Sequence, residues 1–345
     1  MEFSTINKST DYFVANLHTG TGSSQAITTG LNMSANGGMI WNKTRNSVNN
    51  HVLWDTIRGV QETIYTDLDA AEATEATSLT AFTTTGWTGG GSGNTNGSTI
   101  TNVSWNWLAN GAGSSNTDGS ITSSVSANTT AGFSIVSYTG TGSLATVGHG
   151  LGSAPKMVIA KNIGATSNWD VYHSGLSGAN KRVQLNSNGD ESTSGGSWGS
   201  TAPTSSVFTV QDDTATNVSD NTYIAYCFSE ISGYSKFSSY TGNGVVDGTF
   251  IYTGFKPAFV IHKRTDTDAS WMMYDNKRQT INPKDQTLFA DLNNAESGGD
   301  AVDFLSNGFK QRSTGASQNA SNGTYIYMAF GQPIISNSGV CATAK

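Results

Sequence analysis

One pattern occurs three times along this chain, and it limits the possible folds more than any other feature. The segment Phe133–Gly142 (FSIVSYTGTG) recurs as Lys236–Gly244 (KFSSYTGNG) and, more faintly, as Phe13–Gly22 (FVANLHTGTG). The copies are spaced by about 100 to 120 residues. This spacing is too long for a propeller blade or a solenoid turn and suits a complete small β-domain.

Three further landmarks follow each copy in the same order. An apolar segment comes first, then an aromatic segment, and finally an Asn-containing turn that leads into a second aromatic segment. The apolar segments are GLNMSANGGMIWNKTR (30–45), GLGSAPKMVIAKN (150–162) and TGFKPAFVIHKR (253–264); the first aromatic segments are VLWDTIRG (52–59), NWDVYH (168–173) and SWMMYDNKR (270–278); the closing segments are NGSTITNVSWNW (96–107), NVSDNTYIAYCF (217–228) and NASNGTYIYMAF (319–330).

The residue pattern within each repeat favours strands over helices. Short apolar runs lie at 156–161, 223–228, 258–263 and 325–330, and the Thr-Gly-Thr-Gly sequences supply residues that tolerate positive φ at chain reversals. We therefore expect an all-β protein of three tandem β-sandwich, jelly-roll-like domains, with Trp54, Trp169 and Trp271 as equivalent core anchors. The only helical candidate is 67–78 (DLDAAEATEATS), which has almost no apolar face and is expected to form at most a short helical turn.

The repeats give a division of the chain into domains. Repeat 1 departs most from the shared pattern, and the segment before repeat 2 has the composition of a flexible linker. The expected boundaries are 1–108 for repeat 1, 109–132 for the Gly/Ser/Thr/Asn-rich linker, 133–232 for repeat 2, 233–333 for repeat 3 and 334–345 for a C-terminal tail.

Charge and cysteine content argue against several classes of protein. The net charge is −7 and the only basic clusters are Lys-Arg pairs, so we expect no nucleic-acid partner. No apolar run reaches the 18 to 20 residues of a membrane helix, and the first residues lack the features of a signal peptide, so we expect a soluble chain without membrane insertion. The two cysteines, Cys227 and Cys341, do not make a disulfide framework, and Cys227 is expected to be a buried thiol.

The sequence contains no catalytic signature, and we expect neither an enzyme nor a cofactor. The five histidines are scattered without zinc-site spacing, and Gly140–Gly150 lacks the Lys-Ser/Thr of a phosphate-binding loop. Ser143 and Ser174 have a histidine nearby, but no nucleophile elbow. We expect turn, surface or structural roles for these residues.

Two kinds of binding residue are nevertheless candidates. Trp87 and Trp198 are flanked by glycines, have no counterpart in the other repeats and could stack on sugar rings if they are exposed at loop tips, although packing in a core is the commoner explanation. Asp212, Asp213 and Asp220 lie in one turn-rich stretch and could hold Ca²⁺, although no EF-hand spacing is present and a solvated acidic loop is the commoner explanation. The pairs Asp67/Asp69 and Asp266/Asp268 are weaker candidates of the same kind.

The strings that carry the repeat also resemble a known family. DGSITSSVSANTTAGFSIVSYTGTG, VGHGLGSAPKMVIAKN and WDTIRG are similar to a poorly characterised repeat domain in structural proteins of marine bacteriophages, such as those infecting cyanobacteria. The resemblance covers about residues 13–333 and implies a virion location, other virion proteins of the tail or capsid as partners, and contact with a host cell-surface glycan or protein. It carries no known functional residues; because repeat 1 departs most from the shared pattern, the resemblance further implies that this repeat attaches to the virion particle.

A tail fibre or related appendage is the first expectation that follows from this resemblance. The alternatives are a capsid decoration or head-fibre protein and, least favoured, a glycan depolymerase, because catalytic tailspikes usually show repeats of about 20 to 25 residues. Virion β-proteins often assemble around symmetry axes, so a homo-oligomer is expected, with a trimer as one form.

Overall fold

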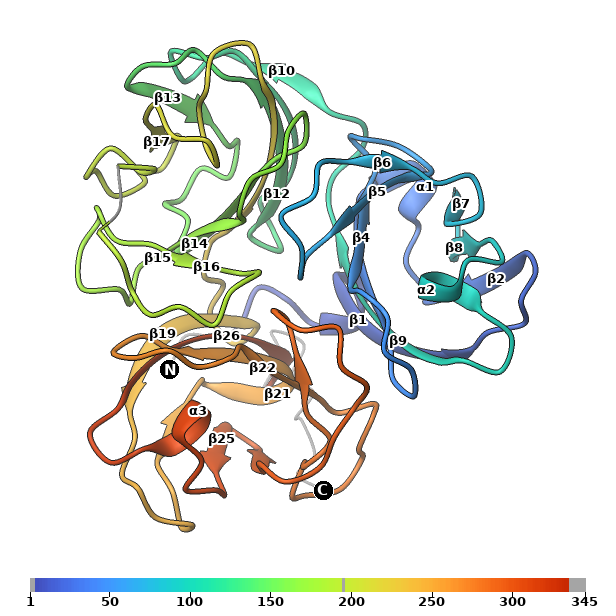
Figure 1. The fold of residues 1–345 in the computed structure, drawn as a ribbon, viewed down its shortest axis with the longest axis vertical. Helices are drawn as coiled ribbons and strands as arrows, with labels where there is room; N and C mark the ends of the chain where they lie inside the picture. The colour runs from blue at the N-terminus through green and yellow to red at the C-terminus, as the bar shows by residue number, and fades with distance from the viewer. Residues whose placement is uncertain (1–3, 194–195, 335–345) are drawn as a thin grey trace.

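The chain forms three similar β units that surround a common centre (Figure 1). This computed structural model describes residues 4–193 and 196–334, and its sheets are all antiparallel. Its helices are single short turns, η1 (Ser9–Asp11), α1 (Met33–Asn36), α2 (Gly93–Asn96) and α3 (Ala316–Asn319). The predicted all-β fold of several sandwiches is confirmed.

Repeat 1 contains a six-stranded sheet and a three-stranded sheet. The large sheet has the order β1-β9-β3-β4-β5-β6 and the small sheet the order β2-β8-β7. Their bounds are β1 (Phe13–Thr19), β2 (Gln25–Thr28), β3 (Gly38–Thr44), β4 (Val52–Asp55), β5 (Glu62–Tyr65), β6 (Ala73–Thr74), β7 (Leu79–Thr83), β8 (Gly86–Gly89) and β9 (Thr101–Leu108). The helical turn expected within 67–78 is absent, because this segment forms turns and the two-residue strand β6, which pairs with β5.

Repeat 2 has a similar arrangement, but two strands are added at one edge of its large sheet and its small sheet has two strands. Its large sheet has the order β10-β11-β12-β18-β14-β15-β16, and β13 pairs with β17. The bounds are β10 (Ser114–Asn116), β11 (Ser123–Asn128), β12 (Phe133–Thr139), β13 (Ala145–Gly148), β14 (Met157–Asn162), β15 (Asp170–His173), β16 (Val183–Gln184), β17 (Val207–Val210) and β18 (Thr222–Phe228). The prediction of a flexible linker at 109–132 was wrong, because β10 and β11 in this segment extend the sheet.

Repeat 3 follows the same order of strands. The large sheet is β19-β26-β21-β22-β23 and the small sheet is β20-β25-β24. The bounds are β19 (Ser235–Thr241), β20 (Phe250–Tyr252), β21 (Phe255–Arg264), β22 (Met272–Asp275), β23 (Leu288–Phe289), β24 (Val302–Leu305), β25 (Gly308–Gln311) and β26 (Thr324–Pro333). In each repeat the first long strand therefore pairs with the last, which pairs in turn with the strand of the apolar segment.

Each large sheet is covered on both faces, which explains why its strands are continuous apolar runs. Along β18, Tyr223, Ala225 and Cys227 face the small sheet of repeat 2. The alternating residues Ile224, Tyr226 and Phe228 belong to a different cluster. A strand's side chains point alternately to the two faces of its sheet, so β18 contributes to two cores at once.

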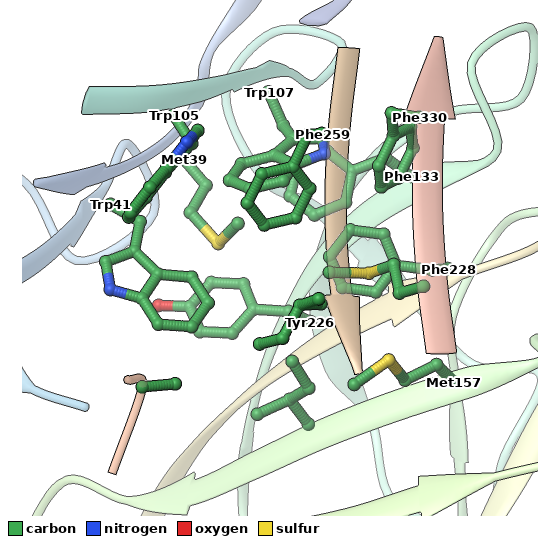
Figure 2. Packing of buried hydrophobic residues seen from close by; sticks show 14 of the residues in the cluster. Met39, Trp41, Trp105, Trp107, Phe133, Met157, Tyr226, Phe228, Phe259 and Phe330 are labelled. Carbon is green, nitrogen blue, oxygen red and sulfur yellow. The ribbon is translucent and has the colours of Figure 1, made fainter. Parts of the chain in front are cut away.

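The second of these cores is shared by all three repeats. Phe13 stacks on Phe330 with 5.3 Å between the ring centroids, and Trp107 lies 5.8 Å from Phe259 and 6.2 Å from Phe228. Figure 2 shows the rings of Trp107, Phe228, Phe259 and Phe330, which come from all three repeats, meeting in one cluster. The expectation of three tandem sandwiches, each with its own core anchor, is therefore only half right: each sandwich has a core of its own, and the other face of its large sheet contributes to a central core.

The strand pairing also corrects the choice of equivalent tryptophans. Trp54 lies opposite Ile40, as Tyr172 lies opposite Val158 and Tyr274 opposite Val260. Trp54 thus belongs to the core inside repeat 1, whereas Trp169 and Trp271 belong to the central core. The residue three positions before Trp54, His51, is the equivalent of Trp169 and Trp271.

The Thr-Gly-Thr-Gly turns of repeats 1 and 2 and the Thr-Gly-Asn-Gly turn of repeat 3 are each fixed by one buried asparagine. Asn96, Asn217 and Asn319 are fully buried, and each accepts a hydrogen bond from the backbone amide of the residue between the two glycines, at 3.1, 2.8 and 3.0 Å. The second glycine of each turn has positive φ, as the sequence predicted: 74° at Gly22, 68° at Gly142 and 71° at Gly244.

We expect Gly140→Ala to destabilise the protein by about 2 kcal/mol, because a Cβ at this position would lie 2.2 Å from the carbonyl oxygen of Val218. Chemical denaturation measures this loss. The matched control is Gly93→Ala, since neither glycine has positive φ and an added Cβ on Gly93 would meet no atom within 4 Å. Equal losses for the two variants would contradict the steric explanation.

Candidate functional site

Three lysines occupy equivalent positions and join the repeats at the central core. Lys43, Lys161 and Lys263 are fully buried and lie opposite Val103, Ile224 and Ile326. Each Nζ donates a hydrogen bond to a carbonyl of the neighbouring repeat: to Asn293 at 3.3 Å, to Asp69 at 3.2 Å and to Asn188 at 2.9 Å, respectively. The bonds run from repeat 1 to 3, from 2 to 1 and from 3 to 2, so they close a ring.

Burial changes the acidity of these ammonium groups. Desolvation lowers the pKa of Lys43, Lys161 and Lys263 to about 8, against the ordinary value of 10.5, although nearby aspartates partly oppose the shift. Each lysine also donates to a carbonyl of its own repeat, at 2.8, 2.7 and 2.6 Å for Thr44, Asn162 and Ala269. Each lysine therefore connects the backbone of its own repeat to the backbone of the neighbouring repeat.

We expect the free energy of unfolding to rise with pH between about 8 and 10. In this window the unfolded chain keeps lysine protons that the folded chain has released, and stability rises wherever the unfolded state binds more protons. Above pH 10 the sign reverses, because burial raises the pKa of tyrosines such as Tyr138 and Tyr226, so the unfolded chain loses phenolic protons first.

Urea denaturation at several pH values measures this slope. Lys161→Met should lower the slope of the unfolding free energy against pH by the contribution of about one proton. Lys8→Met should leave this slope unchanged, because the Lys8 side chain is 68% exposed. A slope that is flat or negative between pH 8 and 10 in the parent protein would contradict the explanation.

Buried Asp–Arg pairs form a second set of contacts between repeats, and we call these inter-repeat contacts joints. In repeat 1, Arg58 Nε donates to Asp55 Oδ2 at 2.6 Å; in repeat 3, Arg278 Nε donates to Asp275 Oδ2 at 2.6 Å. Each Oδ2 also receives a bond from the next repeat, from Tyr226 Oη at 2.7 Å and from Trp105 Nε1 at 3.2 Å, respectively. The ion pairs thus link repeat 1 to 2 and repeat 3 to 1.

The equivalent joint in repeat 2 is uncharged. His173 takes the place of the aspartate, and its Nδ1 accepts the amide of Gly175 at 2.9 Å while Nε2 lies 3.1 Å from the carbonyl of Tyr327 in repeat 3. Burial lowers the pKa of His173 to about 4, so the ring is neutral at pH 7. Met328, the counterpart of Trp105 and Tyr226, has no donor, which explains why the contact is made to the backbone.

A third set of contacts closes the same ring through the backbone. The amides of Glu72, Glu191 and Glu296 donate to carbonyls of the next repeat: Ile163 at 3.0 Å, Thr265 at 2.9 Å and Arg45 at 2.7 Å. Glu296 also forms a two-pronged ion pair with Arg45, with 2.5 Å between Oε2 and Nε. The three repeats are therefore locked head to tail into one body.

The structure places both candidate sugar-stacking tryptophans in cores. Trp87 is fully buried in the sandwich of repeat 1, and Trp198 is 3% exposed in the sandwich of repeat 2. Trp87 pairs with Ile27 as Phe309 pairs with Ile251, so it does have a counterpart among the repeats. Neither indole presents a face to solvent, and the stacking prediction was wrong.

The candidate calcium ligands are not brought together. Asp213 is paired with Arg182 and caps the amide of Ala215, whereas Asp212 and Asp220 are exposed. Asp266 is bound by Arg264, and Asp67 accepts the amide of His51. Across residues 4–193 and 196–334, no three acidic, histidine or cysteine side chains lie close enough to hold a metal ion.

The other residues considered in the sequence analysis lie in buried positions or in turns. His51, His149, His173 and His262 are buried, and His18 bonds the carbonyl of Thr95. Ser143 and Ser174 are exposed in turns, and Gly140–Gly150 is a turn followed by β13. Cys227 is a free, buried thiol as predicted, and burial raises its pKa; Cys341 lies outside the described residues.

A cleft of about 460 Å³ lies beside the joint between repeats 2 and 3. Its walls carry carboxylates and hydroxyls, including Glu191, Asp266, Ser177 and Thr241. Asp266 is held by Arg264 at 2.9 Å and by the amide of Thr324 at 3.0 Å, and these contacts lower its pKa to about 2. The cleft therefore offers hydrogen-bond acceptors in fixed positions.

The joints were missed from the sequence although a signal for them exists. The lysine recurs at one place in NKT, AKN and HKR, and the Asp–Arg spacing recurs in WDTIR and YDNKR. Charged residues that recur at one repeat position, inside or beside apolar runs, indicate buried pairs. The partners in the next repeat could not be found this way.

Comparison with known proteins gives a family and no activity. A domain of unknown function, DUF7483, matches residues 8–333. No curated protein and no solved structure matches the chain. Among the described residues, no helix is long and apolar enough to cross a membrane. The match spans all three repeats, and the chain belongs to the DUF7483 family, whose function is unknown.

Proposed function

We propose that the chain is a non-enzymatic structural component of a bacteriophage virion, located in the virion as part of a tail fibre or related appendage that contacts the host surface. The observation that carries this proposal is the use of the recurring charged residues. Lys43, Lys161, Lys263 and the Asp–Arg pairs bind neighbouring repeats to one another. Their recurrence is explained by assembly of a rigid body.

The sequence supports the virion location. The strings that resemble marine bacteriophage structural proteins include WDTIRG, and its Asp55 and Arg58 form one of the joints. A particle outside the cell benefits from a body in which every repeat is braced by two others, because local opening of one repeat then costs contacts with its neighbours as well.

Exposed apolar side chains support a partner at repeat 3. Val245, Val246, Phe250 and Tyr252 are 51, 61, 44 and 62% exposed, and they belong to one loop and the following edge strand β20. Edge strands and exposed apolar side chains are where proteins pair with others. The partners in this proposal are other virion proteins, a further copy of the chain in a homo-oligomer, and a host glycan or protein.

Immunogold labelling of phage particles with an antibody against the chain tests the location. We expect gold on the tail or its appendages. Gold over the head would replace the appendage with a capsid decoration or head fibre, and unlabelled particles would reject the virion location. Release of reducing sugars from host polysaccharide by the purified chain would reject the non-enzymatic role and favour a depolymerase.

A further inference from the structure

Repeat 3 contains a small crevice whose lining is basic. The crevice has a volume of about 190 Å³ and lies between β21, the loop after β22 and the strand β24. Its lining includes Lys256, Pro257, Asn276, Asn282, Lys284 and Phe304. None of the lining residues is acidic. This combination differs from the acceptor-rich cleft between repeats 2 and 3.

The position of the crevice is a property of the repeat. A crevice in repeat 1 is lined by Thr56, Val60 and Phe82. Strand pairing makes Phe82 the counterpart of Phe304, since they lie opposite Trp87 and Phe309. Thr56 and Asn276 likewise follow the paired residues Asp55 and Asp275. The fold therefore forms this hollow twice.

The chemistry of the crevice is particular to repeat 3. In repeat 1 the remaining wall is made of small and apolar residues such as Met33, Ala81 and Ala112, with no lysine among the lining residues. In repeat 3 two lysines converge on the same hollow. The fold can therefore form this hollow without the two lysines.

Lys284 is held in place as a fixed positive charge. It is 3% exposed, and its Nζ donates to the carbonyls of Gln279 at 2.9 Å and Ile281 at 3.3 Å, above the ring of Phe304 at 5.2 Å. Burial is the main cause that lowers the pKa of Lys284; Asp275 and Asp303 oppose this effect, and repulsion from the nearby Lys256 adds to it. An anion in the crevice would relieve that repulsion.

The neutral lining suits a sugar ring. Asn276 is half-buried and Thr280 is exposed at the rim, so both can reach hydroxyl groups. Asn282 is oriented by the backbone of Phe304, with bonds of 2.8 and 3.0 Å. Pro257 and Phe304 add apolar surface. A few oriented polar groups beside apolar walls are typical of a small-molecule site. The volume of the crevice is below the roughly 300 Å³ at which drug-sized pockets begin, so the crevice suits a single sugar ring.

We propose that this crevice binds one carboxylate-bearing unit of an acidic saccharide, with Lys256 and Lys284 facing the carboxylate and the amides facing its hydroxyls. The inference rests on the proposed contact with a host surface and names the class of ligand for it. Charge-assisted hydrogen bonds from the two ammonium groups give the carboxylate its preference over a neutral sugar.

Titration calorimetry on the full chain tests the proposal with tri-galacturonic acid, its methyl ester and inorganic phosphate as probes. We expect the acid to bind at least 10-fold more tightly than the ester, and Lys256→Glu to weaken it at least 10-fold. Lys277→Glu is the matched control, since Lys277 is exposed, lies next to Asn276 and does not line the crevice, and its affinity should stay within twofold. Thermal melting checks that both variants are folded.

Four outcomes would overturn the inference: no binding of the acid, equal binding of the ester, equal effects of the two variants, or phosphate binding as tightly as the acid, which would leave a simple anion site. These outcomes are independent of the particle labelling. Labelled tails without saccharide binding would reject only the crevice, whereas binding by the chain with unlabelled particles would reject the virion proposal and keep the ligand.

Discussion

Trp107→Ala is expected to destabilise all three repeats together, by about 3 to 5 kcal/mol. Trp107 is 1% exposed in the central core. Its ring lies 4.8 Å from Phe13, 5.8 Å from Phe259 and Phe330, and 6.2 Å from Phe228, which together represent repeats 1, 2 and 3. Truncation leaves a cavity that no single repeat can refill, because the three sheets are fixed by the joints around it.

Hydrogen exchange read by mass spectrometry, together with urea denaturation, checks this prediction. We expect faster exchange in β9, β18 and β26 of the variant. Phe208→Ala is the control, because Phe208 is also fully buried but packs only within the sandwich core of repeat 2. Its effect on exchange should centre on β17, β13 and their neighbours. A Trp107 variant whose loss of protection stays within repeat 1 would show that the central core does not couple the repeats.

The strands of the fold were predictable because their side chains leave little alternative. The runs at 223–228, 258–263 and 325–330 lie within β18, β21 and β26, and the run at 156–161 overlaps β14 from Met157 onward. Each is apolar on both faces, and the structure explains this by the two cores on either side of the large sheet. The sequence showed that both faces are buried, but not that the second face meets the other repeats.

Two predictions were wrong: one overlooked a strand made of small residues, and the other aligned residues of different repeats without knowing how their strands pair. In β11 (Ser123–Asn128), Val125 is the only large apolar residue, so the segment looks like a linker until it pairs with β12. Trp54 was aligned with Trp169 and Trp271 because an indole is easily recognised, yet cross-strand partners place it three positions away. Pairing is a property of two strands and cannot be read from one.

The binding candidates failed for a related reason. Glycines around Trp87 suggested an exposed tip, but they allow close backbone approach instead: a Cβ on Gly86 would lie 2.1 Å from the carbonyl of Ile27, and one on Gly90 would lie 2.4 Å from that of Thr77. The joints join residues that are far apart in sequence, such as Trp105 and Asp275, which are 170 positions apart. Their chemistry was visible in the sequence and their partners were not.

Asp275→Ala is expected to cost about 3 to 5 kcal/mol of unfolding free energy, because it leaves a buried guanidinium with only Glu296, 3.9 Å away, as a counter-ion. The side chains of Arg278 and Asp275 are 1 and 0% exposed. Burial alone would raise the pKa of Asp275, but the Arg278 guanidinium and the amides of Arg278 and Lys277 hold it below the ordinary value. The substitution also removes the acceptor of Trp105 Nε1 and so weakens the joint to repeat 1.

Repeat 2 supplies the control for this experiment, because His173 and Leu176 occupy the positions of Asp275 and Arg278 in an equivalent joint. Chemical denaturation should find the double variant Asp275→His/Arg278→Leu less destabilised than Asp275→Ala, since it removes both charges and restores a ring nitrogen as acceptor for the backbone amide of Lys277. Asp11→Ala, which breaks the exposed pair with Lys8, should change stability by less than about 1 kcal/mol. If Asp275→Ala proved as mild as Asp11→Ala, the buried pair would not be what holds repeat 3 to repeat 1.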